Sequence, residues 1–145
     1  MSRSRNDGKY LEDAVYIEFS KELSMDFMWR RLYDTQTAGK GLPPQPADFD
    51  ICYQGYSAHL ESKTSGEKTK SLKSFSQYAD MRRWSMAGKP GYVLLHLYYF
   101  DELFLFDVSR LDPELKSWPA TLALRINHIN QLTETLKGLL CQKFL

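Results

Sequence analysis

Hydrophobic and polar positions alternate in two short runs near the middle of the chain, residues 46–53 and 56–63. Gln54-Gly55 lies between them, and a glycine at the second position of a two-residue loop favours a β-hairpin. In that register Phe49 lies opposite Leu60, and Asp48 lies opposite Glu61. Side chains alternate between the two faces of a strand, so one face is apolar and the other is charged. The apolar face consists of Phe49, Ile51, Ala58 and Leu60, and the charged face of Asp48, Asp50, His59, Glu61 and Lys63.

The remaining pattern predicts helices and strands on both sides of this hairpin. A helix capped by Asn6 or Asp7 is expected to run to about Ser24, because four apolar residues recur at helical spacing. Another helix is expected to start at Asp112-Pro113-Glu114, and the last one is expected to start at Pro119. The apolar stripe of the first helix is Leu11, Val15, Phe19 and Leu23, and that of the last is Leu122, Ile126, Ile129, Leu132 and Leu136. Further predictions are strands at 27–33, 92–99 and 103–108, a helix at 75–87, and a polar, lysine-rich loop at 64–74.

This order of elements predicts an α/β fold, a mixed sheet flanked by helices, in a single domain of residues 1–145. Strand 92–99 is almost continuously apolar, which suits a strand buried on both faces.

The two opposed carboxylates suggest a metal site. Like charges directly opposite one another, with β-carbons roughly 5 Å apart, destabilise a sheet unless a cation lies between them. Carboxylate oxygens are the ligands that Mg²⁺ and Mn²⁺ prefer. Lys63 follows Glu61 by two residues and therefore lies on the same face. Glu12 borders the apolar stripe of the first helix, where it either joins such a site or remains a solvated helix edge.

The overall composition says little about function, but the distribution of charge along the chain says more. The whole chain has a net charge of only +1, but residues 61–90 carry seven basic and three acidic residues. Arg3 and Arg5 make the N-terminus basic. The spacing of Cys52 and Cys141 indicates neither a zinc site nor a disulfide framework. No signal peptide and no long apolar run is found, which predicts an intracellular protein without a membrane segment.

Pro46-Ala47-Asp48 and Glu61-Ser62-Lys63 together resemble the two half-motifs of the PD-(D/E)xK nuclease superfamily. Within it, the chain resembles RecU-type Holliday junction resolvases of bacteria and their phages, through these motifs and Leu72-Lys73-Ser74-Phe75. Gly8-Lys9-Tyr10-Leu11-Glu12 resembles the segment that opens the first helix in these resolvases. An isolated Glu-x-Lys is common, and Glu114-Leu115-Lys116 is an example without an opposed acid. In place of the family's His- and Gln-containing stretch, this chain has only Gln77.

The resemblance implies a restriction-endonuclease-like fold and a Mg²⁺- or Mn²⁺-dependent endodeoxyribonuclease that resolves four-way DNA junctions. Asp48, Glu61, the Ser62 carbonyl and Glu12 would hold the metal, and Lys63 would act on the scissile phosphate. It also implies a homodimer, since two opposed strands must be cut, in a bacterial or phage-infected cytoplasm. DNA contacts are expected from Arg3, Arg5, Lys68, Lys70, Lys73, Gln77 and Arg82.

Other interpretations stay open. The charged hairpin face could be a salt-bridged surface, and the lysine loop could be only solvated. The protein could instead be a restriction, repair or flap endonuclease on the same fold, or a DNA-binding relative without activity. The intact Asp48, Glu61 and Lys63 speak against the last, because a pure binder has no need for opposed acids.

Overall fold

The computed structural model describes residues 8–32 and 45–142 of the chain. Its main element is a six-stranded mixed sheet in the order β1-β2-β3-β5-β6-β8. Strands β3 and β5 are parallel, and the other neighbours are antiparallel. The strands are β1 (Phe27–Arg31), β2 (Phe49–Tyr53), β3 (Tyr56–Ser65), β4 (Ser71–Lys73), β5 (Gly91–Leu97), β6 (Glu102–Asp107), β7 (Ser117–Pro119) and β8 (Leu124–Ile126). The helices are α1 (Gly8–Ser20), α3 (Tyr78–Met86) and α4 (Leu132–Gln142), with short 3-10 turns at Val108–Arg110, Ala120–Leu122 and Ile129–Gln131.

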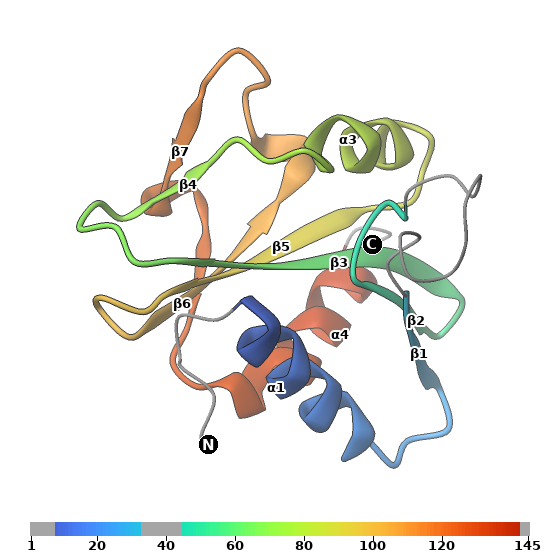
Figure 1. The fold of residues 1–145 in the computed structure, drawn as a ribbon. Helices are drawn as coiled ribbons and strands as arrows, with labels where there is room; N and C mark the ends of the chain where they lie inside the picture. The colour runs from blue at the N-terminus through green and yellow to red at the C-terminus, as the bar shows by residue number, and fades with distance from the viewer. Residues whose placement is uncertain (1–7, 33–44, 143–145) are drawn as a thin grey trace, which may run out of the picture.

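The sheet is covered on both faces, which confirms the predicted fold class. Figure 1 shows α1 and α4 on one face and α3 with the two-stranded β4–β7 sheet on the other. Each face has its own apolar cluster. The cluster under α1 and α4 includes Phe19, Phe49, Leu60 and Leu136, and the cluster under α3 includes Met81, Val93, Phe106 and Trp118. Strand β5 is buried over its whole length, as its apolar sequence predicted.

The central hairpin forms in the predicted register. Phe49 pairs with Leu60 and Ile51 with Ala58. Gln54 and Gly55 have φ values of 52° and 86°. Positive φ at both central positions is the geometry of the two-residue turn whose twist matches that of the flanking strands. The ladder ends at Phe49, so Asp48 lies just before β2 rather than within it.

Four predicted elements differ in the structure, the last helix among them. The first helix ends at Ser20, and Leu23 is 90% exposed. Asp112 caps a turn and not a helix: its side chain accepts from the Glu114 amide, and its carbonyl accepts from the Trp118 indole. The lysine-rich segment is not all loop, because β3 runs on to Ser65 and residues 71–73 form β4.

The predicted last helix begins at Leu132 rather than at Pro119. Residues 117–119 are extended and pair with β4, which brings Trp118 opposite Leu72. Both of these side chains are buried, and this burial outweighs the helical spacing of the apolar residues. Ile126 lies in β8, where it pairs with Leu103 at the edge of the main sheet. Of the predicted stripe, only Leu132 and Leu136 belong to α4.

Within the described ranges, no helix is long and apolar enough to cross a membrane. Arg3, Arg5 and the expected cap at Asn6 or Asp7 lie outside the described residues.

Candidate active site

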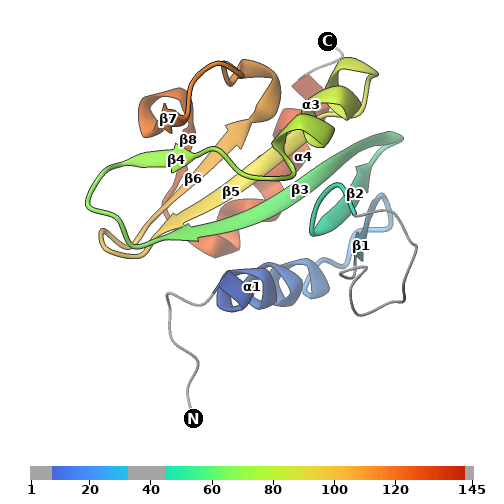
Figure 2. The same ribbon diagram turned by 45° about the horizontal axis from the view of Figure 1, so that its top comes forward.

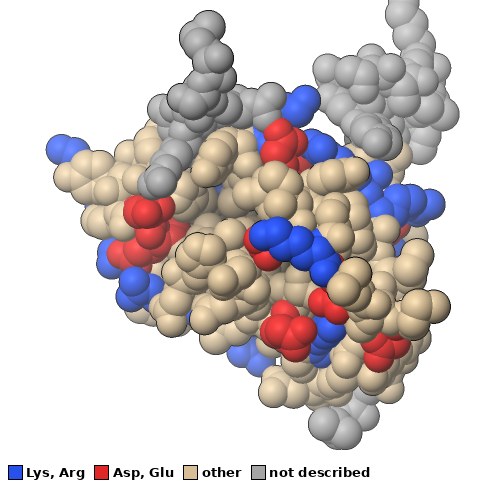
Figure 3. Space-filling view, turned by 90° about the horizontal axis from the view of Figure 1, so that it is seen from below, with Lys and Arg blue, Asp and Glu red and all other residues tan. Residues whose placement is uncertain are grey.

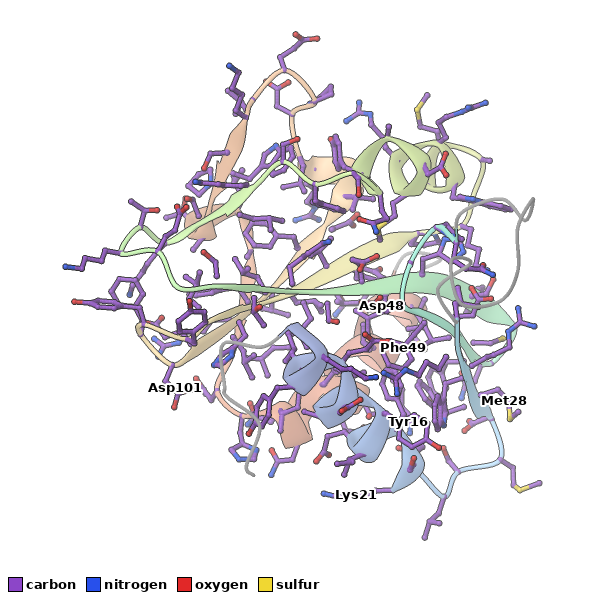
Figure 4. All side chains as sticks on the ribbon, viewed as in Figure 1. Tyr16, Lys21, Met28, Asp48, Phe49 and Asp101 are labelled. Atoms are coloured by element: carbon purple, nitrogen blue, oxygen red, sulfur yellow. The ribbon has the colours of Figure 1, made fainter. Side chains whose placement is uncertain are left out.

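Asp48 is held at the start of β2 by the neighbouring strand. One of its carboxylate oxygens, Oδ2, accepts hydrogen bonds from the Ser62 amide at 2.9 Å and from the Ser62 hydroxyl at 2.7 Å. Its own carbonyl accepts from the Leu32 amide at 2.7 Å. Figure 4 shows Asp48 and Phe49 beside β3, with Met28 on β1 and Asp101 near the other end of the sheet. The hairpin register therefore places Asp48 next to the Glu61-Ser62-Lys63 segment.

Glu61 is only 3% exposed and lies against Asp48. Burial raises the pKa of Glu61 far above its usual value. The charge of Asp48 and a hydrogen bond between the two carboxyl groups raise it further, while nearby Lys63 lowers it. A carboxylate in this position carries a charge that burial disfavours, so without another cation Glu61 retains its proton.

Glu12 extends this acidic group from α1. Burial and the charge of Asp48 both raise its pKa, and Glu12 also acts electrostatically on Glu61. Its carboxylate accepts from Arg31 Nε at 2.9 Å, and Arg31 Nη2 donates to Asp13 at 3.1 Å. Three acids from α1, the start of β2 and β3 thus lie within electrostatic reach of one another.

The donor chemistry of this group fits a hard divalent cation. Asp48 and the buried Glu61 are the kind of ligand pair that binds Mg²⁺ or Mn²⁺, and such a cation would take the place of the Glu61 proton. In the described part of the chain, no three His, Cys, Asp or Glu side chains are already arranged as a complete metal site. Glu12 accepts from Arg31 through Oε1, so a metal would have to share this carboxylate with Arg31.

Lys63 lies at the side of the acidic pair. Its ammonium is 4.0 Å from Glu61 Oε1 and donates to Gln77 Oε1 at 3.3 Å. It also lies 5.3 Å from the centre of the Phe75 ring. Gln77 directly precedes α3, so the start of that helix helps to position the lysine.

The basic residues expected to contact DNA have different surroundings. Lys70 pairs with Glu102 at 2.8 Å, and Lys73 pairs with Glu67. Arg82 donates to the Leu111 carbonyl at 2.9 Å and to the Tyr78 hydroxyl, so it fastens α3 to the segment after β6. The ammonium of Lys68 lies over the Tyr99 ring at 5.7 Å.

Sequence reasoning missed the arginine pair of β1. Arg30 and Arg31 are adjacent, so their side chains point to opposite faces of the sheet. Arg30 binds Asp50 at 2.9 Å, and Arg31 binds Glu12. Two arginines in an otherwise apolar strand were the available signal, and Arg31, which is partly buried, needs an acidic partner.

The fold can be placed among known proteins although the sequence cannot. No protein-family model and no curated protein sequence matches the chain. The structure is similar to that of Hjc from Archaeoglobus fulgidus, a Holliday junction resolvase from an archaeal hyperthermophile. The TM-score is 0.58 with 20% identity, over 86% of this chain and 98% of Hjc. The chain therefore shares the overall fold of Hjc.

The bacterial homing endonuclease I-Ssp6803I is a second similar structure. Its TM-score is 0.49 with 11% identity, over 99% of this chain and 97% of that one.

Proposed function

We propose that this protein is a divalent-metal-dependent endonuclease that resolves four-way DNA junctions by paired phosphodiester hydrolysis. The observation that carries the proposal is the buried Asp48–Glu61 carboxyl pair with Lys63 beside it, on a nuclease fold. The RecU-like sequence features and the structural likeness to Hjc both support junction resolution over other endonuclease activities. A restriction, repair or flap endonuclease on the same fold is the alternative.

Asp48, Glu61, the Ser62 carbonyl and Glu12 would hold one or two Mg²⁺ or Mn²⁺ ions. Such an ion, when bound, lowers the pKa of water and neutralises charge on the phosphate. The Ser62 amide and hydroxyl orient the Asp48 carboxylate for this task. Gln77 and Phe75 keep the Lys63 ammonium close to the carboxylates, where it can donate to a phosphate oxygen as negative charge develops.

DNA would approach from the α3 side of the sheet, because Glu61 and Lys63 face that side with Gln77. On the opposite side, viewed from below in Figure 3, the acidic and basic side chains of the described residues are interspersed. Lys68, Lys70, Lys73 and Arg82 would bind phosphates without reading bases, and Arg3 and Arg5 would add to them. The protein would act as a homodimer in the cytoplasm. Its two-fold axis would place one active site on each of the two DNA strands to be cut.

The test is incubation with a synthetic four-way junction and with linear duplex of the same sequence, in Mg²⁺ or in EDTA. The parent should cut the junction at paired, symmetric positions in Mg²⁺ only and leave the duplex intact. Lys63→Ala should reduce the cleavage rate by roughly two to four orders of magnitude while junction affinity stays within a few fold. Lys116→Ala, in the second Glu-x-Lys of the chain, is the matched control and should cut normally. Equal cutting of duplex would refute resolution and favour the alternative, and no cutting of any DNA would refute both.

A further inference from the structure

Two connections meet at one end of the sheet and form what we call the tip, residues 66–70 and 98–102. Both views of the ribbon show the β3–β4 connection beside the β5–β6 turn there (Figures 1 and 2). The Tyr98 amide donates to the Ser65 carbonyl at 3.1 Å. The Tyr98 ring and hydroxyl lie so close to Gly66 that any side chain at position 66 would collide with them. The tip is therefore one packed unit rather than two independent loops.

The tip presents aromatic rings with lysines over their faces. Tyr99 is 56% exposed, and its ring meets that of Phe100 edge-on at 5.0 Å. The ammonium of Lys68 lies 5.7 Å from the centre of Tyr99, and that of Lys70 lies 5.0 Å from the centre of Phe100. An exposed ring next to a lysine is a combination by which proteins bind unpaired nucleic acid, since a base stacks on the ring and the cation meets a phosphate.

Two of the three acids of the tip are paired with lysines, and the third, Asp101, contacts His96. Glu102 pairs with Lys70 at 2.8 Å and with Arg125 at 3.7 Å. Asp101 lies 3.1 Å from His96 Nε2, and Glu67 pairs with Lys73. Among the ion pairs of residues 8–32 and 45–142, none includes the exposed Lys68. Lys68 therefore remains available to a phosphate beside the Tyr99 ring.

The tip also lies at a useful distance from the candidate active site. Lys68 follows Lys63 by five residues, and an extended chain spans at most about 3.6 Å per residue, so the two are within roughly 18 Å. One DNA strand advances about 3.4 Å per nucleotide. A base held at the tip would thus lie within about five nucleotides of a phosphate at Lys63.

We propose that Tyr99, with Lys68, is a stacking platform for an unpaired nucleobase at the branch point of the DNA substrate. This inference rests on the proposed function and deepens it: the enzyme would favour branched DNA because stacking is interrupted at the branch point, so a base there can leave its helix at lower cost. Tyr99 is the stacking residue, and Phe100 supports its ring from the side.

The experiment measures affinity in EDTA for two four-way junctions that differ at one nucleotide. One carries a single unpaired adenosine at the crossover, and the other carries an abasic residue at the same position. The parent should bind the first more tightly by roughly 5- to 100-fold, the range that base–aromatic stacking provides. Tyr99→Leu should bind both junctions equally, and Tyr99→Phe should retain the parental preference because it keeps the ring.

The proposal is overturned if the parent shows no preference between the two junctions, or if Tyr99→Leu retains the preference. It is also overturned if Tyr99→Phe loses the preference along with Tyr99→Leu. Cleavage of an ordinary four-way junction in Mg²⁺ is scored separately. A protein that prefers the adenosine but cuts nothing loses the proposed nuclease function and keeps the platform, whereas one that cuts junctions without the preference loses only the platform.

Discussion

Asp48 and Asp50 lie two residues apart on the same hairpin, and their surroundings differ in charge. Asp50 binds Arg30 at 2.9 Å and Lys89 at 2.8 Å, and it lies 3.2 Å from His59 Nε2. Although burial alone would raise the pKa of Asp50, the hydrogen bonds from Lys89 and Arg30 outweigh it and lower the pKa. A carboxylate at this position of the sheet can therefore be fully satisfied by the protein's own cations.

The Asp48 side of the hairpin shows the opposite arrangement. Asp48 meets Glu61, a second acid, and the nearest cation to that pair is Lys63 at 4.0 Å. Arg31, which could have neutralised the group, is engaged by Glu12 and Asp13. The comparison separates two uses of buried carboxylates. Asp50 is ionised and paired with the protein's own cations, whereas Glu61 keeps a proton beside Asp48 that a bound cation would displace.

The two aspartates should differ most in their importance for cleavage activity. Asp48→Asn should lower the rate of junction cleavage in Mg²⁺ by roughly three orders of magnitude or more, because it removes a charged metal ligand. Asp50→Asn is the matched change two residues away and should cut within a few fold of the parent at a temperature where it is folded. Single-turnover cleavage assays measure both. Equal losses would mean that the two acids do not have separate roles.

For stability, by contrast, the larger loss is expected from Asp50→Asn. Asp50→Asn should reduce the free energy of unfolding of the metal-free protein by about 2 kcal/mol, because Arg30 and Lys89 lose a charged acceptor. Asp48→Asn should leave it unchanged or raise it, because removing the Asp48 charge lessens the pKa shift of Glu61 and so the cost of burying that carboxyl group. Urea denaturation in EDTA makes the measurement. A large loss for Asp48→Asn would show that Asp48 is structural.

Metal should stabilise the fold only where Asp48 is intact. At a free Mg²⁺ or Mn²⁺ concentration tenfold above its dissociation constant, the parent should gain about 1.4 kcal/mol. Asp50→Asn should show a similar gain, and Asp48→Asn should show little or none. Thermal unfolding with and without metal, followed by a return to EDTA, checks this. If Asp48→Asn is stabilised as much as the parent, the metal binds elsewhere.

Glu61, beside Asp48, and His59, beside Asp50, should make the free energy of unfolding depend on pH with opposite signs. Each proton contributes at most about 1.4 kcal/mol per pH unit. Glu61 has a raised pKa in the folded state, so its contribution to the stability of the metal-free protein should fall as the pH rises above 4.5. Burial lowers the pKa of His59 to about 4, so its contribution should be lost as the pH falls below 6.5. Glu61→Gln should remove the first slope and His59→Gln the second, as measured by denaturation between pH 4 and pH 8. If each variant keeps the parental slope, other groups are responsible.

The hairpin could be read from the sequence because its information is local. The alternation of Phe49 to Tyr53 and a glycine at position 55 are enough to set the register, and with it the approach of Asp48 to Glu61. The arginine partners could not be read, because Arg30 meets Asp50 of β2 and Arg31 meets Glu12 of α1 only through tertiary packing. The last helix was overpredicted for a similar reason: the helical spacing around Leu122 is real, but pairing of Trp118 with Leu72 decides the local structure.

The two-residue connection at Gln54-Gly55 has a consequence for folding kinetics. Hairpins closed by short turns form in about 1–10 μs, whereas contacts between distant segments form later because loop closure costs entropy. Asp48 and Glu61 can therefore meet early, while Glu12 reaches them only when α1 docks on the sheet. The acidic pair would form before its third member, and divalent cations present during refolding should speed the final docking step rather than the initial collapse.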